Sequence, residues 1–472
     1  MQNTMQPVGR SCGDQSDAQR YFTVWRWHFY AGVFVTPFLI LLALTGLGMI
    51  FTANIYGKDG ERMKVAVQTV AKPLSQQAQV ALDAVDKAQG MVVQYIAPRA
   101  ADTVAVFRVN DGSGKATMVA VDPYTAEVAA AYPRNKGFYY LMDNIHSDML
   151  LGGVGDYILE TAAALTVLLV ISGWWLWYQK QGSLPRMLVS PFGKKRSWWR
   201  SLHGSVGTWI SLMLLVFCVS GMAWAGIWGG KAVQAWNQFP AGKWGVVPDP
   251  ESVVPVHGDL NDGETKEIPW VLELTPMPQS GTTVGVGGIA PGLPPTLDTV
   301  DRFARESGFQ GRYHLYFPKG KTGVWTLNRD SMSYDSPSPT ADRTVHIDRY
   351  SGKVLADIRF NDYSAFGKFM AAGVAFHMGT MGWWSVVLNM VFCLAVVGMC
   401  VSGWIMWWQR RPKNAAGLLP PPQKNVAAPK TLLVVLLVSA VVFPTAAAAV
   451  AAVWLLDRLL LVCLPRMAAY LK

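Results

Sequence analysis

The chain has 472 residues, of which 51% are hydrophobic and 15% are charged. This composition is too apolar for an ordinary soluble protein and too polar for a chain that lies in a membrane throughout. The formal net charge of +10 comes largely from two basic connections between apolar stretches. Because such connections are explained by membrane topology, the charge gives no reason to expect a nucleic-acid partner.

Five apolar stretches are long enough to cross a hydrocarbon layer of about 30 Å, which makes membrane lipid the expected surroundings. They are roughly Trp25–Phe51, Tyr157–Tyr178, Thr208–Trp228, Trp384–Trp408 and Thr431–Leu456. The first stretch is longer than the apolar part of a signal peptide, starts late, and lacks an A-x-A exit. We therefore interpret it as a span and not as a cleaved leader.

Basic residues orient these spans. The connections 180–200 and 410–430 contain several Lys and Arg and no Asp or Glu. The positive-inside rule places both connections in the cytoplasm, together with the N-terminus. The long segments 56–145 and 230–370 then lie outside, and five spans place the C-terminus outside as well.

The predicted fold class is an α-helical transmembrane bundle of five spans, built by tandem duplication, with two small α/β domains outside the membrane. In chain order the expected parts are a cytoplasmic tail 1–24, span 25–55, outer domain 56–145, span 146–179, basic loop 180–200, span 201–229, outer domain 230–370, span 371–408, cytoplasmic loop 409–430, span 431–461 and tail 462–472.

The two outer segments repeat one another. Each contains a helical pattern followed by alternating strands, and each reaches a similar turn, VDPYT at 121–125 and IDRYS at 347–351. The Asp side chain can cap this turn, and Gly352 relieves it in the second copy. The second segment carries an insertion, 284–295, whose GVGG lacks the strand-turn-helix context of a dinucleotide-binding loop.

Four histidines stand at matched places in the two copies. His28 and His203 each precede a Thr-Gly or Ser-Gly pair whose glycine follows after 18 residues. His146 leads to Ser172-Gly173-Trp174 after 26 residues, and His377 leads to Ser402-Gly403-Trp404 after 25. Histidine is costly beside hydrocarbon and rare there without a task, so four at repeated positions suggest axial ligands of haem iron.

The matched positions predict two layers, an inner haem between His28 and His203 and an outer haem between His146 and His377. No CxxCH motif occurs, so the cofactor would be about two b-type haems, held only by ligands and packing. Arg26 and Arg200 lie within three residues of the inner pair and could hold the propionates, although membrane anchoring explains them equally well. No catalytic side chain is predicted, because the cofactor would perform the redox chemistry.

Other polar and aromatic residues have plainer interpretations. A straight helix from His146 to Ser172 would be about 39 Å long, which places His146 at the outer interface unless Gly152, Gly153 and Gly155 bend the segment. The Trp clusters 174–177 and 404–408 are typical of interfacial belts. For the histidines of the outer segments, His257, His314 and His346, packing or surface placement is expected.

The stretches WRWHFYAGVFVTPFLILLALTGLGMIF and WWRSLHGSVGTWISLMLLVFCVSGMAW resemble the "R-x-x-H … TG" helix of the PepSY-associated transmembrane family. NIHSDMLLGGVGDYILETAAALTVLLVISGWWLWY is similar to that family's "LH-x-x-LL-x-G-x-x-G … SG-x-x-LWW" helix, and IDRYSGKVL resembles the PepSY hairpin. The second copy departs from the pattern, with HMGTMGWW after His377. The resemblance covers nearly all of residues 20–411.

The resemblance implies PepSY-like periplasmic domains in a bacterial inner-membrane protein, and some members of the family reduce ferric siderophores through b haems bound by histidines. We therefore expect an oxidoreductase that passes electrons outward to the Fe(III) of a siderophore or another chelate and releases Fe(II). The cytoplasmic loops are too short for a flavin or nicotinamide domain, so a separate flavoprotein reductase or a membrane quinol would supply the electrons. Two alternatives remain open: a non-redox protein whose PepSY modules bind peptides or regulate a peptidase, and a transporter.

Overall fold

The computed structural model describes residues 12–189, 193–233, 255–261, 266–412, 418–421, 434, 438 and 441–452. Within this part of the chain, four helices are long and apolar enough to cross a membrane, and they contain residues Arg20–Ile55, Gly153–Gln181, Arg196–Met222 and Trp383–Arg410. They correspond to the first four predicted spans. The fifth expected span, 431–456, is described only at residues 434, 438 and 441–452, and it stays a prediction.

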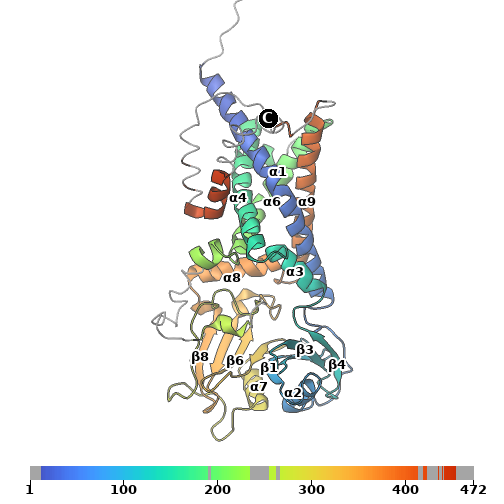
Figure 1. Ribbon diagram of the computed structural model, residues 1–472, viewed down its shortest axis with the longest axis vertical. Coiled ribbons are helices and arrows are strands. Elements are labelled where there is room, and N and C mark those ends of the chain that lie inside the picture. The colour runs from blue at the N-terminus through green and yellow to red at the C-terminus, as the bar shows by residue number, and fades with distance from the viewer. Residues whose placement is uncertain are drawn as a thin grey trace, which may run out of the picture. The chain divides into compact units, whose positions relative to one another are not determined.

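Helices and strands alternate in two similar series along the chain (Figure 1). The helices are α1 (Cys12–Ile55), α2 (Leu74–Asp83), α3 (Phe138–Asp148), α4 (Gly153–Gln181), α5 (Leu184–Leu188), α6 (Arg196–Met222), η1 (Trp228–Val233), η4 (His257–Leu260), α7 (Leu297–Glu306), η5 (Pro339–Ala341), η6 (Phe360–Asp362), α8 (Ala365–Met378) and α9 (Trp383–Arg410). The strands are β1 (Met91–Ile96), β2 (Ala105–Asn110), β3 (Ala116–Val121), β4 (Val128–Pro133), β5 (His314–Tyr316), β6 (Trp325–Arg329), β7 (Arg343–Ile347) and β8 (Val354–Arg359).

The contacts divide the chain into two compact units. The helical unit comprises the described parts of 1–44, 146–230 and 391–472, and the sheet unit comprises the described parts of 45–145 and 231–390. The helical unit holds most of α1 and α9 together with α4 and α6, and the sheet unit holds all eight strands. The two copies of the repeat are therefore both present in each unit.

In the helical unit, α4 of the first copy packs against α6 of the second. The ring of Trp177 lies directly over Gly204, where a larger residue would leave no room for it. The indole N–H of Trp177 donates to the Met187 carbonyl, and that of Trp174 donates to the Ser211 hydroxyl. These two tryptophans, predicted as part of an interfacial belt, thus form hydrogen bonds that join α4 to its neighbours.

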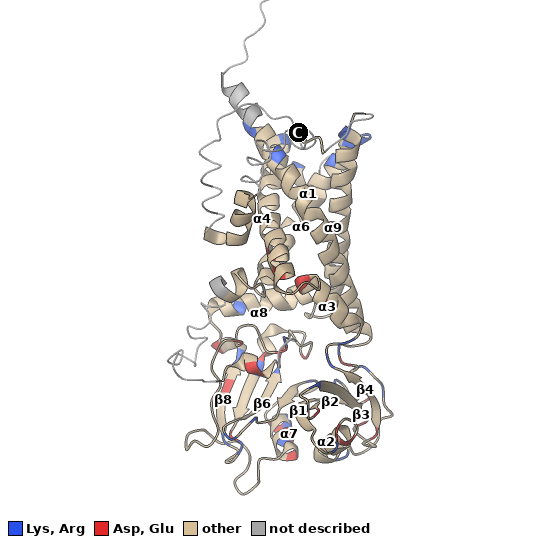
Figure 2. Cartoon of the chain, in the orientation of Figure 1, with Lys and Arg blue, Asp and Glu red and all other residues tan. Residues whose placement is uncertain are grey.

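Basic side chains gather at one end of the helical unit, where α4 and α9 end and α6 begins (Figure 2). Arg196 lies close enough to Lys180 and to Arg410 to interact electrostatically. The Arg410 guanidinium also stacks over the rings of Trp25 and Phe29 on α1, at about 5 Å from each centroid. This end of the bundle is the one that the positive-inside rule assigns to the cytoplasm.

Two predicted spans are interrupted near their histidines. The segment from His146 to Ser172 is not one straight helix, because α3 ends at Asp148 and α4 begins only at Gly153. Positive φ angles at Met149, Leu150 and Gly152 turn the chain between the two helices. His377 likewise lies in the last turn of α8, which ends at the left-handed Gly379 before α9 begins at Trp383.

In the sheet unit, both copies contribute to one antiparallel sheet of order β4-β3-β2-β1-β5-β6-β7-β8. The two segments that were expected as separate small domains meet where β1 pairs with β5, with Gln94, Tyr95 and Ile96 opposite Tyr316, Leu315 and His314. Side-chain alternation predicts each half of the sheet, but it does not reveal that the two edge strands pair with one another.

One face of the sheet carries the apolar core and both helices. Alternate strand residues such as Tyr95 and Leu315 pack with Ala78 of α2 and Val300 of α7 in a single buried cluster. The two helices are also linked, because the Asp298 carboxylate of α7 accepts the backbone N–H of Leu74 at the start of α2, at 2.7 Å. The first N–H groups of a helix have no partner within that helix, so the Asp298 carboxylate of α7 supplies one for the N-terminus of α2.

The opposite face of β5, β6 and β7 is polar and fully covered. It carries His314 and Tyr316 on β5, Thr326 and Asn328 on β6, and Thr344 and His346 on β7, each at most 1% exposed. The covering residues His257, Glu267, Asp330 and Asp335 supply partners for His346, Tyr316, Asn328 and His314, respectively. This half of the sheet is therefore buried on both faces, with apolar packing on one and hydrogen bonds on the other.

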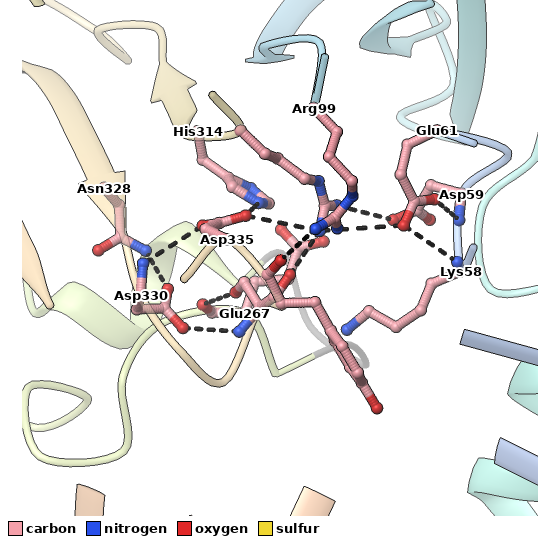
Figure 3. Close-up of polar contacts among 12 residues, drawn as sticks. Lys58, Asp59, Glu61, Arg99, Glu267, His314, Asn328, Asp330 and Asp335 are labelled. Atoms are coloured by element: carbon pink, nitrogen blue, oxygen red, sulfur yellow. Dashed lines mark hydrogen bonds and ion pairs between the residues drawn. The ribbon is translucent and has the colours of Figure 1, made fainter. Parts of the chain in front are cut away.

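Charged residues from both copies meet at this polar face (Figure 3). The buried guanidinium of Arg312 lies 3.9 Å from Asp59, 3.9 Å from Glu61 and 3.5 Å from Asp335. It also donates to the Ser333 carbonyl. Asp59 and Glu61 belong to the first copy and Arg312 to the second, so the cluster joins the two halves of the sheet unit.

Replacing Arg312 by leucine leaves three carboxylates buried without this cation. We expect Arg312→Leu to lower the free energy of unfolding by about 3–5 kcal/mol, the usual result of removing one partner from a buried ion pair. Thermal unfolding of the purified full-length protein measures the effect. Arg302→Leu, at an exposed position on α7, should change it little. An equal loss of stability in the two variants would show that the Arg312 cluster contributes no more to the free energy of unfolding than an exposed arginine does.

Candidate functional site: a paired histidine centre in the helical unit

His28 on α1 is fixed by a serine on α4. The His28 Nδ1 lies 2.9 Å from the Ser172 hydroxyl oxygen. That hydroxyl donates its own hydrogen to the Leu168 carbonyl, at 2.8 Å, so its oxygen is left to accept. With the hydroxyl donating to Leu168, the geometry assigns the proton between the two residues to His28 Nδ1, and in the neutral imidazole the Nε2 then carries the lone pair.

The second copy repeats this arrangement. His203 Nδ1 on α6 lies 2.9 Å from the Ser402 hydroxyl of α9, and that hydroxyl donates to the Met399 carbonyl at 2.7 Å. His203 Nδ1 also lies 3.2 Å from the Met399 carbonyl, which can only accept. Nδ1 is again the protonated nitrogen, and the lone pair again lies on Nε2.

A glycine follows each serine and lies beside the histidine ring. A methyl group at Gly173 would come within 3.1 Å of His28 Cε1, whereas at Gly403 the corresponding distance to His203 is 3.7 Å. The Ser-Gly step repeated in the sequence thus has two physical roles. The serine holds the imidazole by a hydrogen bond in both copies, and in the first copy the glycine leaves space for the ring.

The two histidines of the inner pair come together as predicted, since they are close enough to interact electrostatically. Histidine ligands of metals usually donate their second ring nitrogen to a carbonyl, carboxylate or water, which fixes the tautomer and orients the ring. His28 and His203 meet this requirement with serine hydroxyls in the same role. Two imidazoles are a donor set that would suit a haem iron, with His28 and His203 as the residues that would hold it.

The two arginines predicted beside this pair differ in their surroundings. Arg26 donates to the Pro421 carbonyl at 2.8 Å and to the Tyr30 hydroxyl at 2.9 Å. Arg200 is exposed on the first turns of α6, near Tyr21 and Lys180. Both are cations within reach of the basic end of the bundle, and their role toward propionates stays a prediction.

The predicted outer pair is distributed over the two units. His146, at the end of α3, belongs to the helical unit, where its ring hydrogen-bonds the Leu42 carbonyl of α1. His377 belongs to the sheet unit, and the Asn389 amide donates to its backbone carbonyl at 3.0 Å. The pairing of His146 with His377 stays a prediction from the sequence.

The remaining histidines are buried in the sheet unit, as packing predicts. His314 lies 3.4 Å from Asp335; burial alone would lower its pKa, but this carboxylate outweighs burial and raises it. His257 and His346 join their Nε2 atoms at 2.9 Å. Because His257 Nδ1 donates to the Thr275 carbonyl at 2.8 Å, its Nε2 accepts from His346.

Ser172 and Ser402 are the functional residues that the sequence analysis did not assign, and the repeated Ser-Gly step was the signal that could have identified them. Serine is small and common in membrane helices, so the motif alone does not distinguish helix packing from a bond to histidine.

An acidic residue on α4 has a structural role. Glu160 accepts the backbone N–H groups of Ile227 and Trp228, at 3.1 and 3.2 Å, after the end of α6.

Comparison with known families places this geometry in a class of membrane protein. The family described as the PepSY-associated TM region matches residues 25–410. The chain belongs to this family. The match includes both His–Ser pairs and the whole sheet unit from 45 to 390. No curated protein matches the chain in sequence.

The His257–His346 pair predicts a loss of stability in acid. Burial lowers the pKa of His257 to about 4, and burial together with the neighbouring His257 lowers the pKa of His346 well below its usual value. Since these folded-state pKa values lie below that of an unfolded histidine, the contribution is complete above about pH 6.5 and is lost as the pH falls toward 4. A shift of this size on His257 corresponds to about 2 kcal/mol between pH 7.5 and 5.

The variant His346→Gln isolates this contribution, because a glutamine carbonyl can accept a hydrogen bond from charged His257. Asp330 acts in the opposite direction, since burial and Asp335 raise its pKa to about 6 and its contribution grows as the pH falls. The informative quantity is therefore the difference in unfolding temperature between wild type and His346→Gln at each pH. Wild type should lose more than the variant between pH 7.5 and 5, and parallel profiles would contradict the assignment.

Proposed function

We propose that the chain is a haem b-containing electron-transfer protein that reduces ferric iron in a siderophore or another chelate and releases Fe(II). The observation that supports the proposal is the duplicated His–Ser pair. Two part-buried histidines, one from each copy, contact a serine hydroxyl through Nδ1, which assigns the lone pair to Nε2, the atom that would coordinate iron. A purely structural histidine needs its hydrogen bonds satisfied, but it does not need this matched arrangement.

When bound, the haem supplies reversible one-electron transfer. The protein holds its own part of the centre rigid. Ser172 and Ser402 orient the imidazoles, the packing of Trp177 on Gly204 keeps α4 and α6 in register, and the apolar helices exclude water. Arg26 and Arg200 are the cations proposed to hold the propionates, where each would form charge-assisted hydrogen bonds.

The proposed reaction transfers one electron to Fe(III) and leaves the chelator unchanged. Hard oxygen ligands hold Fe(III) far more tightly than Fe(II), so the added electron weakens the chelate. The electron would come from a flavoprotein reductase in the cytoplasm or from a membrane quinol. A second haem between His146 and His377, closer to the periplasm, completes the proposed path of electrons across a bacterial inner membrane.

Haem content tests the proposal directly. Protein purified from haem-replete cells should contain about two b haems per chain by the pyridine haemochrome assay, and His28→Ala and His203→Ala should lose the same one. Leu212→Ala, on the exposed surface of α6, is the matched control and should keep both. A colourless wild-type preparation, or the loss of different haems from the two histidine variants, would refute the inner pair.

The serines provide a finer test. Ser172→Ala and Ser402→Ala remove the acceptor from Nδ1 and should weaken haem binding about 10- to 100-fold, as loss of a partner to a ligating histidine usually does. Ser→Thr at the same positions restores the hydroxyl and should restore the affinity. The visible spectrum and the midpoint potential of the inner haem report the change. Alanine and threonine variants that behave alike would show that the hydroxyl does not orient the ligand.

Reduction of the chelate is measured separately. Proteoliposomes that contain a reductant should reduce an external ferric siderophore, with Fe(II) trapped by an impermeant chelator, in vesicles where the sheet unit faces the bulk solution. His146→Ala should abolish this reaction while the inner haem remains reducible. A normal rate in that variant would exclude the outer haem as the exit site.

A further inference from the structure

The sheet unit contains a cavity of about 500 Å³ at the point where α1 ends. Its walls come from the segment after Ile55 and from the end of β4, and they include Tyr56, Arg62, Tyr132 and Lys136. This volume lies within the range of about 300–1,000 Å³ that is typical of sites for small molecules. The cavity has no part in the histidine centre described above.

The charged lining of the cavity is entirely positive, since Arg62 and Lys136 line it and no Asp or Glu does. The Arg62 Nε donates to the Ala53 carbonyl at 3.0 Å, which anchors the side chain and leaves both terminal nitrogens of the guanidinium to meet a ligand. Lys136 is exposed, and no ion pair with it is found in the described part of the chain. Two cations held in one cavity favour an anion with several oxygen acceptors.

The neighbouring carboxylates do not cancel this charge inside the cavity. Asp59 and Glu61 are close in sequence to the lining residues, but they are 2% and 3% exposed and face the Arg312 guanidinium. Burial and these two carboxylates raise the pKa of Tyr132, so its phenol stays protonated and adds no negative charge. Asp59 and Glu61 are thus paired with Arg312 and do not line the cavity.

Two aromatic rings complete the lining. Tyr56 lines the cavity and is 65% exposed, and Tyr132 contributes a second, partly buried ring. The loop between them bends through positive φ angles at Gly57 and Gly60, and a side chain at Gly60 would collide with the Tyr132 hydroxyl. The glycines therefore allow the loop to pass close to the tyrosine and form the cavity wall.

We propose that this cavity binds a negatively charged, aromatic ferric chelate of the catecholate class. This inference rests on the proposed function, and it names the substrate class of that function. Catecholate oxygens around Fe(III) leave the complex with a net negative charge, which Arg62 and Lys136 complement, and catechol rings can stack on Tyr56 and Tyr132. A cationic or neutral hydroxamate chelate lacks the charge, and a citrate chelate lacks the rings.

The test uses gallium(III) in place of iron, because its complexes resemble those of Fe(III) and are not reduced. Titration of the full-length protein with Ga(III) tris-catecholate, followed by calorimetry, should show binding that Arg62→Gln together with Lys136→Gln weakens at least tenfold. Tyr56→Leu should weaken it less. Lys115→Gln, an exposed lysine in the turn before β3, is the matched control and should bind as wild type does.

Gallium complexes of other chelators test which class of chelate the cavity binds. Ga(III) hydroxamate should bind much more weakly than the catecholate, and Ga(III) citrate should bind weakly and be insensitive to Tyr56→Leu. Wild-type affinity in the Arg62/Lys136 double variant, equal binding of the hydroxamate complex, or competition by vesicles of anionic phospholipid in place of the chelate would overturn the proposal.

Failure of this inference can be told from failure of the proposed function. Binding of the gallium complex does not require haem. A folded, haem-containing protein that reduces a ferric hydroxamate but does not bind Ga(III) catecholate would disprove the cavity assignment alone. A protein that binds the gallium complex through Arg62 and Lys136 but never contains haem would disprove the electron-transfer function alone.

Discussion

The pairing of β1 with β5 is the interaction on which the sheet unit depends. Only three residues of each strand face one another, yet they join eight strands into one sheet. The pairing also places the start of β5 beside the segment that follows α1, so that Arg312 meets Asp59 and Glu61. A buried cation and buried carboxylates are each costly alone and tolerable only together. The two halves of the duplication must therefore fold as one unit.

The sequence predicted the large features of the molecule well, because they follow from local patterns. The first four apolar stretches are helices long enough to cross a membrane, each half contributes four strands to one sheet, and His28 and His203 are close enough to interact electrostatically. The sequence did not predict the features that depend on contacts between segments far apart in the chain. The edges of the two half-sheets pair because each is otherwise unsatisfied, and alternation of side chains carries no information about that choice.

The breaks between α3 and α4 and between α8 and α9 were also only partly predictable from the sequence. Gly152 was recognised as a possible bend, and the chain does turn there, but Met149 and Leu150 also have positive φ angles that no sequence rule would assign to them. His257 and His346 were expected either to pack or to lie at the surface, and both are buried. Their direct bond joins residues 89 positions apart and needed the fold to become visible. Ser172 and Ser402 stood in a recognised motif whose chemistry depends on the helix opposite.

The glycines beside the two histidines give the duplicated centre an unequal mechanical character. His28 rests against the backbone of α4 with no space behind its ring, since a methyl group at Gly173 would lie 3.1 Å from it. His203 has ordinary van der Waals clearance at Gly403, where the distance is 3.7 Å. One imidazole is therefore packed tightly against a helix backbone as well as bonded to its serine, whereas the other has a looser contact with its glycine and bonds both a serine hydroxyl and a backbone carbonyl. A centre built from two similar halves thus holds its two histidines in different ways.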